Sequence, residues 1–160
     1  MNLLNKPLEL DAANQLSVRE FIRIPFYDVD MAGMVWHGHY LKYFEVARSA
    51  LLDGIGYNYR EMIETGVLWP VIDSSTRYIR PLFLDQEVLV SAALREFQLR
   101  MVIDYRILDE QGVVYSKGRT IQAPVDGKTR QLQLGSPDLL VERVNACIQK
   151  LSSKTAGESR

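Results

Sequence analysis

The sequence predicts an α+β fold in which an antiparallel sheet covers one long, buried helix. Apolar residues occupy most of the helix circumference between residues 39 and 53, so this helix must be buried on nearly every side. Three later runs are rich in Val, Ile, Leu and Tyr, as strands are, at 87–96, 100–109 and 113–123. The turn sequence Asp109–Gly112 joins the last two runs as a hairpin, which favours antiparallel pairing. Helix and strands therefore predict a single sheet packed on the helix.

The first half of the chain predicts one strand and two helices. Alternating apolar residues over 18–26 are typical of a half-buried strand. The helix at 39–53 is expected to end at Gly54 or Gly56, because glycine is common just past a helix C-terminus. A shorter helical pattern over 57–65 precedes Gly66.

The second half of the chain predicts extended structure and then a final helix. Residues 67–80 form an extended segment that is interrupted near Trp69-Pro70 and ended by Pro81, because proline lacks the amide that a ladder needs. The three strands follow. Leucine, valine and isoleucine recur at helical spacing over 137–151, which predicts a C-terminal helix.

Length and composition predict one globular domain spanning residues 1–160. The chain is 47% hydrophobic, which suffices for one core, expected at about 17–151, while the mixed or polar ends at 1–16 and 152–160 are expected to be frayed. Lys and Arg number 19 against 20 acidic residues, so no electrostatic footprint for nucleic acid is present. The single Cys147 excludes an internal disulfide and fits a cytoplasmic location. No apolar run reaches the roughly 18 residues of a membrane span.

Two aspartates, Asp28 and Asp30, lie with Gly33 and His37 at the junction between the first strand and the long helix. Unpaired backbone amides and the positive end of the dipole lie at a helix start, where they can hold a developing oxyanion. A structural interpretation competes with this one: either aspartate could cap the helix or close an Asx-turn, with Gly33 supplying a positive φ. The local pattern leaves both interpretations open.

Three further polar side chains near this junction have competing roles. His37 and His39 form a His-x-His pair, but the chain holds only these two histidines, so no metal site is expected. His39 is expected to be an ordinary surface residue at the helix entry. Glu45 is the second candidate for a catalytic carboxylate, although an i,i+3 ion pair with Arg48 is the favoured role.

The junction also resembles a known family. It carries the pattern Asp28-x-Asp30-x-x-Gly33-x-Val35-x-His37-x-x-Tyr40, followed by Glu45-x-Ala47-Arg48. This pattern resembles the signature of the hotdog-fold thioesterases of the 4-hydroxybenzoyl-CoA thioesterase family. That family includes the short acyl-CoA thioesterases associated with the Tol-Pal system. Residues 71–85 resemble the next strand of that family and its proline-led turn. The resemblance covers about 18–123.

This resemblance implies a fold, an assembly and a chemistry. In the hotdog fold a long central helix is wrapped by an antiparallel sheet, and subunits pair so that active sites lie at a dimer interface, often within a homotetramer. Asp30 matches the catalytic carboxylate, Asp28 a structural partner, and His37 the place where a backbone N–H polarises the thioester carbonyl. Because sulfur is a good leaving group, a carboxylate that attacks directly or deprotonates water can suffice, and the sequence leaves both roles open.

The expected substrate-binding residues are aromatic or basic. Trp36, Tyr40, Trp69 and Tyr78 could line an acyl or aromatic pocket, although aromatic side chains beside a buried helix are more often part of the core. Arg95 and Arg100 bracket a hairpin where the family's 4-hydroxybenzoyl enzymes carry a denser basic cluster for coenzyme A phosphates. The thinner charge here leaves two carriers open, coenzyme A and the phosphopantetheine arm of an acyl carrier protein.

These observations predict an acyl-CoA or acyl-carrier-protein thioesterase that releases a free acid and a thiol. No cofactor is expected apart from the coenzyme A or phosphopantetheine that forms part of the substrate. One alternative is a hotdog dehydratase that uses His37 with Glu45. Another is a non-catalytic acyl-binding or scaffold protein.

Overall fold

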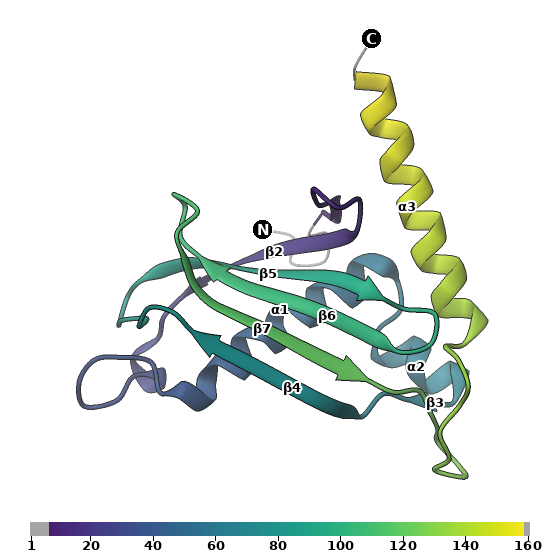
Figure 1. Ribbon diagram of the computed structural model, residues 1–160, viewed down its shortest axis with the longest axis horizontal. Coiled ribbons are helices and arrows are strands. Elements are labelled where there is room, and N and C mark those ends of the chain that lie inside the picture. Colours follow the sequence, from purple (N-terminus) through teal and green to yellow (C-terminus); the bar gives the residue numbers. More distant parts are fainter. Residues whose placement is uncertain (1–6, 159–160) are drawn as a thin grey trace.

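A computed structural model describes residues 7–158 of the chain, and Figure 1 shows its arrangement. Its strands and helices are, in chain order, β1 (Glu9–Leu10), β2 (Leu16–Arg23), the 3₁₀ turns η1 (Phe26–Asp28) and η2 (His37–His39), α1 (Tyr40–Ile55), α2 (Tyr59–Thr65), β3 (Val67–Leu68), β4 (Val71–Tyr78), β5 (Glu87–Glu96), β6 (Met101–Leu108), β7 (Val114–Gln122), β8 (Val125–Asp126) and α3 (Asp138–Glu158).

Six strands form one antiparallel sheet in the order β1-β2-β5-β6-β7-β4, and α1 lies across one face of it (Figure 1). The expected hairpin between β6 and β7 is present, because the Asp109 carboxylate accepts hydrogen bonds from the amides of Gln111 and Val113. The α+β architecture predicted from the sequence, a long helix covered by an antiparallel sheet, is confirmed.

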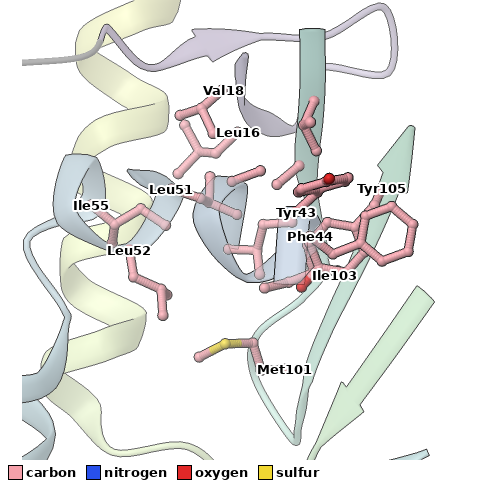
Figure 2. Packing of buried hydrophobic residues seen from close by; sticks show 14 of the residues in the cluster. Leu16, Val18, Tyr43, Phe44, Leu51, Leu52, Ile55, Met101, Ile103 and Tyr105 are labelled. Carbon is pink, nitrogen blue, oxygen red and sulfur yellow. The ribbon is translucent and has the colours of Figure 1, made fainter. Parts of the chain in front are cut away.

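The core fills the space between α1 and the sheet. Figure 2 shows Phe44 of α1 beside Tyr105 of β6, and their rings stack with centroids 4.8 Å apart. Gly118 of β7 makes this close approach possible, because a Cβ there would lie 2.3 Å from Cε2 of Phe44. The helix is therefore seated directly on the sheet, which fixes the position of its N-terminus.

Glycines end the two N-terminal helices as expected. Gly56 follows α1 with φ +78° and Gly66 follows α2 with φ +67°, the left-handed conformation that glycine adopts without strain. A capping box of Asn58 and Glu61 begins α2. The predicted interruption at Trp69-Pro70 separates β3, which pairs with β8, from β4, which pairs with β7.

The chain ends differ from the expectation. Helix α3 continues to Glu158, so the prediction of a frayed segment after residue 151 is wrong for residues 152–158, whose small and polar side chains contain no helix breaker before Gly157. At the other end, residues 9–10 form β1 on the edge of the sheet, while residues 1–6 lie outside the described residues. None of the helices formed by residues 7–158 has the length and apolar character needed to cross a bilayer.

Strand β4 is the long free edge of the sheet (Figure 1). Seven of its eight residues are exposed, and they include Val71, Ile72 and Tyr78. An exposed edge of this length offers unpaired backbone groups to another strand.

Candidate active site

Asp30 lies in a tight loop between η1 and η2. The Asp30 backbone N–H donates to the Met34 carbonyl at 2.8 Å, and its carbonyl accepts from the Gly33 amide at 3.0 Å. Gly33 has φ +75°, which the turn requires. The carboxylate oxygen Oδ1 accepts from the amides of Ala32 (2.8 Å) and Met34 (3.3 Å). Asp30 therefore closes an Asx-turn, which is the structural role considered from the sequence.

This turn leaves the second oxygen of Asp30 available for chemistry. Within the described residues, the carboxylate accepts two hydrogen bonds, and Oδ1 accepts both of them. The Asp30 side chain is exposed. Asp30 lines a cavity of about 320 Å³, together with Met34, Val35, Trp36, His37, Tyr40, Tyr78, Ile79, Arg80 and Pro81. The turn holds one oxygen, and Oδ2 is the atom that can face a substrate.

The start of α1 lies in the same cavity. The first donor within η2 is the His39 amide, which bonds the Trp36 carbonyl at 2.9 Å, so the amides of His37 and Gly38 precede the intrahelical ladder and can donate to a ligand. A Cβ at Gly38 would lie 2.1 Å from Cζ3 of Trp36, so a larger residue there would displace the Trp36 ring that lines the cavity. Tyr78 donates its hydroxyl hydrogen to the His37 carbonyl at 2.9 Å, which holds this peptide against β4.

Asp28 occupies a different environment from Asp30. It is 1% exposed, and it accepts hydrogen bonds from the Tyr43 hydroxyl (2.7 Å) and the Lys42 ammonium, both on α1. His39 Nε2 lies 3.7 Å from Asp28 Oδ1. His39 therefore packs beside this carboxylate and is not the ordinary surface residue that the sequence predicted. The Asp28 carbonyl also accepts from the Trp36 amide at 3.0 Å. Asp28 therefore ties the Asp30 loop to the first turn of α1.

The Asp28 cluster holds its charge despite burial. Burial by itself raises the pKa of Asp28, but the hydrogen bonds from Lys42 and Tyr43 and the positive charge of Lys42 outweigh burial and leave the pKa below its ordinary value. Burial and the hydrogen bond to Asp28 raise the pKa of Tyr43, which keeps its phenol protonated as a donor.

Two predicted site residues lie outside the cavity. Glu45 forms the i,i+3 ion pair with Nη2 of Arg48, on the exposed side of α1. Trp69 is 7% exposed in the core, and its indole N–H donates to the Tyr57 hydroxyl at 3.1 Å. Trp69 therefore does not line the cavity of Asp30, as an acyl-pocket residue would, because it is buried beside Tyr57. Trp36 and Tyr40 do line the cavity.

The two arginines predicted to bind substrate are also elsewhere. Arg95 is held by Asp104 (3.1 Å) and Asp11 (2.7 Å), and Arg100 pairs with Glu96 at 2.8 Å. Neither lines the cavity of Asp30.

Tyr78, which the sequence offered as a possible pocket residue, lines the cavity from the end of β4. Arg80, from the segment after β4, also lines it and was not among the candidates. The available signal for Arg80 was its position at the end of an extended run, directly before Pro81. Within residues 7–158 no three His, Cys, Asp or Glu side chains gather as metal ligands would.

Comparisons with known proteins agree with this geometry. Residues 24–144 match the model of the thioesterase-like superfamily. A Bacillus subtilis protein with the provisional name acyl-CoA thioesterase YneP is 30% identical over 106 residues, which cover 66% of this chain and 77% of that protein. The chain belongs to the thioesterase-like superfamily.

Solved structures show the same fold. A DHNA-CoA thioesterase from Staphylococcus aureus matches with a TM-score of 0.68 and 25% identity, over 88% of this chain and 91% of that one. A variant of 4-hydroxybenzoyl-CoA thioesterase, in complex with 4-hydroxybenzoyl-CoA, matches with a TM-score of 0.69 and 17% identity, over 80% and 98% of the two chains. The hotdog fold and the family resemblance predicted from the sequence are confirmed.

Proposed function

We propose that this thioesterase hydrolyses an acyl thioester, acyl-CoA or its acyl-carrier-protein equivalent, with Asp30 as the catalytic carboxylate. The observation that carries the proposal is the shared cavity: it is lined by Asp30, whose Oδ1 accepts both hydrogen bonds of the turn, and by His37 at the start of η2. Such a pair of groups can act on a carbonyl from two sides, one at carbon and one at oxygen.

The reaction needs only these parts. The thioester carbonyl oxygen is placed against the amides of His37 and Gly38, where negative charge develops in the transition state; one such donor is worth roughly a hundred- to a thousandfold in rate in other enzymes. Asp30 Oδ2 either attacks the carbonyl carbon or removes a proton from an attacking water. In both routes the C–S bond breaks, the sulfur leaves as a thiolate that takes up a proton, and water supplies the second oxygen of the acid.

A substitution at Asp30 tests this role. Asp30→Asn keeps an oxygen that can accept from the Ala32 and Met34 amides, so the loop is expected to keep its shape. Release of thiol from the best substrate in an acyl-CoA panel is expected to fall by several orders of magnitude. Asp138→Asn, at the exposed start of α3, is the matched control and should keep full activity. Near-normal turnover by Asp30→Asn would reject Asp30 as the catalytic group.

The dehydratase alternative has less support from the geometry. It requires His37 and Glu45 to face one substrate, but only His37 lines the cavity, while Glu45 is paired with Arg48. A saturated acyl-CoA, which lacks a β-hydroxyl group, separates the two activities: only a thioesterase releases free thiol from it.

Our proposal includes a homodimer formed through β4. This strand is eight residues long, lies at the edge of the sheet and exposes Val71, Ile72 and Tyr78, while Tyr78 also lines the cavity. Antiparallel pairing of two β4 edges would satisfy their free backbone groups and bring a second chain next to each cavity. Light scattering should report a dimer or a multiple of it, and Ile72→Pro, which removes a backbone donor, should weaken the assembly.

A cytoplasmic location goes with this proposal. Cys147 is the only cysteine and is unpaired, so no disulfide of the chain needs an oxidising compartment.

A further inference from the structure

The face of the sheet opposite α1 carries a row of basic side chains. Strand register places five residues side by side across β2, β5, β6, β7 and β4, and four of them are basic: Arg19, Ser91, Arg106, Lys117 and Arg77. We call these five positions the basic row. They face away from the helix because side chains alternate along a strand, and Tyr105, next to Arg106, stacks on Phe44 of α1.

The charge of the basic row is largely uncompensated. Arg19 pairs with Glu9 at 3.0 Å, but Arg106, Lys117 and Arg77 are exposed and form no ion pair within the described part of the chain. Asp104, which lines the same cavity as these three residues, is already shared by Arg95 and Arg119. Like charges directly opposite each other on neighbouring strands are destabilising. A surface that keeps three of them together is typical of a binding site for an anionic partner.

Three positions of the basic row line a hollow. Arg77, Arg106 and Lys117 line a cavity of about 400 Å³ on this face, together with Arg95, Arg119 and the Asp104 that these two arginines share. The side chains therefore surround a concave surface, and a partner that enters it would contact several cations together.

The row also ends beside the proposed active site. Arg77 precedes Tyr78, and successive residues of a strand point to opposite faces, so Arg77 lies on the outer face while Tyr78 lines the cavity of Asp30. Ile79, Arg80 and Pro81 continue from this strand end and line the same cavity. A partner on the outer face could thus present a flexible arm to the cavity around the end of β4.

We infer that the basic row is the docking surface for an acidic acyl carrier protein that delivers the acyl group as a phosphopantetheine thioester. This inference rests on the proposed function. The row crosses five strands, so its length across the sheet is four interstrand spacings of about 4.8 Å, or roughly 19 Å. This length suits contact with a protein surface and exceeds what a single phosphate group needs. A second copy of the chain is a poor occupant, because a two-fold pair would bring the same positive row against itself. Charge complementarity selects an acidic partner, and the carrier of the substrate is the one that must also reach the adjacent cavity.

The test compares one acyl group on three thiols: an acidic acyl carrier protein, coenzyme A, and N-acetylcysteamine, which carries no charge. Arg106→Glu/Lys117→Glu is expected to lower kcat/KM for the carrier substrate at least tenfold, chiefly through KM, and to leave N-acetylcysteamine turnover unchanged. The wild type should lose carrier activity as salt rises, because screening weakens exposed charges, and the variant should lose this dependence. Lys150→Glu, an exposed charge reversal on α3, is the matched control and should behave as wild type.

Other outcomes overturn the inference. An equal loss with acyl-CoA would assign the row to the phosphates of coenzyme A. Unchanged kinetics of the variant with all three substrates would exclude a role of the basic row in docking. If the variant instead lost binding to phosphatidylglycerol vesicles but kept wild-type kinetics with the carrier substrate, the docking role would likewise be excluded. Arg106→Gln/Lys117→Gln, which only removes charge, should show a smaller loss in the same direction, and circular dichroism verifies its folding.

Failure of the proposed function is distinguishable from failure of the inference. If the wild type hydrolysed no thioester, the proposed function would fail, and calorimetric titration of the carrier protein into wild type and Arg106→Glu/Lys117→Glu would test docking by itself. Equal affinity of the two proteins for the carrier, or no binding by either, would overturn the docking surface.

Discussion

Removing the Asp28 carboxylate is expected to destabilise the fold by about 1–4 kcal/mol, and its contacts with Tyr43 and Lys42 supply the two contributions. In Asp28→Ala the Tyr43 hydroxyl, on a residue 3% exposed, loses its acceptor, and a buried donor left without a partner costs about 1–3 kcal/mol. The lost ion pair with Lys42 adds up to about 1 kcal/mol, because that side chain is 48% exposed and water solvates it afterwards.

Urea unfolding at a fixed protomer concentration measures this change and allows a double-mutant cycle with Tyr43→Phe. A hydrogen bond to a charged acceptor predicts a coupling free energy of about 1.5–3 kcal/mol between the two positions. A loss below about 0.5 kcal/mol for Asp28→Ala, or a coupling within error of zero, would refute the account of this cluster.

The same cluster predicts a pH dependence with a definite sign. The pKa of Asp28 is lowered in the folded state, so its contribution to stability is fully present above the unfolded pKa of roughly 3.9 and disappears as pH falls through the folded value. The difference in unfolding free energy between wild type and Asp28→Asn should therefore be constant from about pH 5 to 8 and should shrink below about pH 4. A difference that grew on acidification would contradict the lowered pKa.

Three further substitutions separate packing from chemistry. Gly118→Ala should cost about 1–3 kcal/mol of stability by overpacking, because the new methyl group meets Phe44, and a more stable protein in thermal unfolding would contradict the close approach of helix and sheet. Trp69→Phe should cost about 1–2 kcal/mol by losing the bond to Tyr57, yet kcat/KM should stay within twofold, whereas a large rise in KM would return Trp69 to the acyl pocket. Glu45→Gln should keep turnover within twofold and change stability by less than about 0.5 kcal/mol, and a hundredfold loss of kcat would make Glu45 the catalytic carboxylate.

Much of the site was predictable because its signals are local. The carboxylates, Gly33 and the helix start follow one another within a short stretch, so their proximity needs no long-range information. The same stretch did not indicate which aspartate would be buried. That depends on Lys42 and Tyr43, which reach Asp28 only once α1 packs against the sheet.

Residue type alone did not separate pocket from core. Trp69 and Trp36 are the same amino acid, but Trp69 is buried beside Tyr57 and Trp36 is half-exposed at the cavity. Arg95 looked like an exposed hairpin arginine, yet Asp104 on the neighbouring strand β6 and Asp11, distant in the sequence, hold it. Tyr78 and Arg80 enter the site because β4 ends beside the start of η2.

By itself, the sequence determined the α+β fold, the order of helices and strands, the glycine helix ends and the strand-to-helix junction that holds Asp30. Each of these follows from periodicity or turn chemistry within a short window of the chain. The tertiary structure alone decided the burial of Asp28, the free edge at β4 and the alignment of Arg19, Arg106, Lys117 and Arg77 into one row. These properties depend on strand register and helix packing, which join residues that are far apart in sequence and carry no local signal.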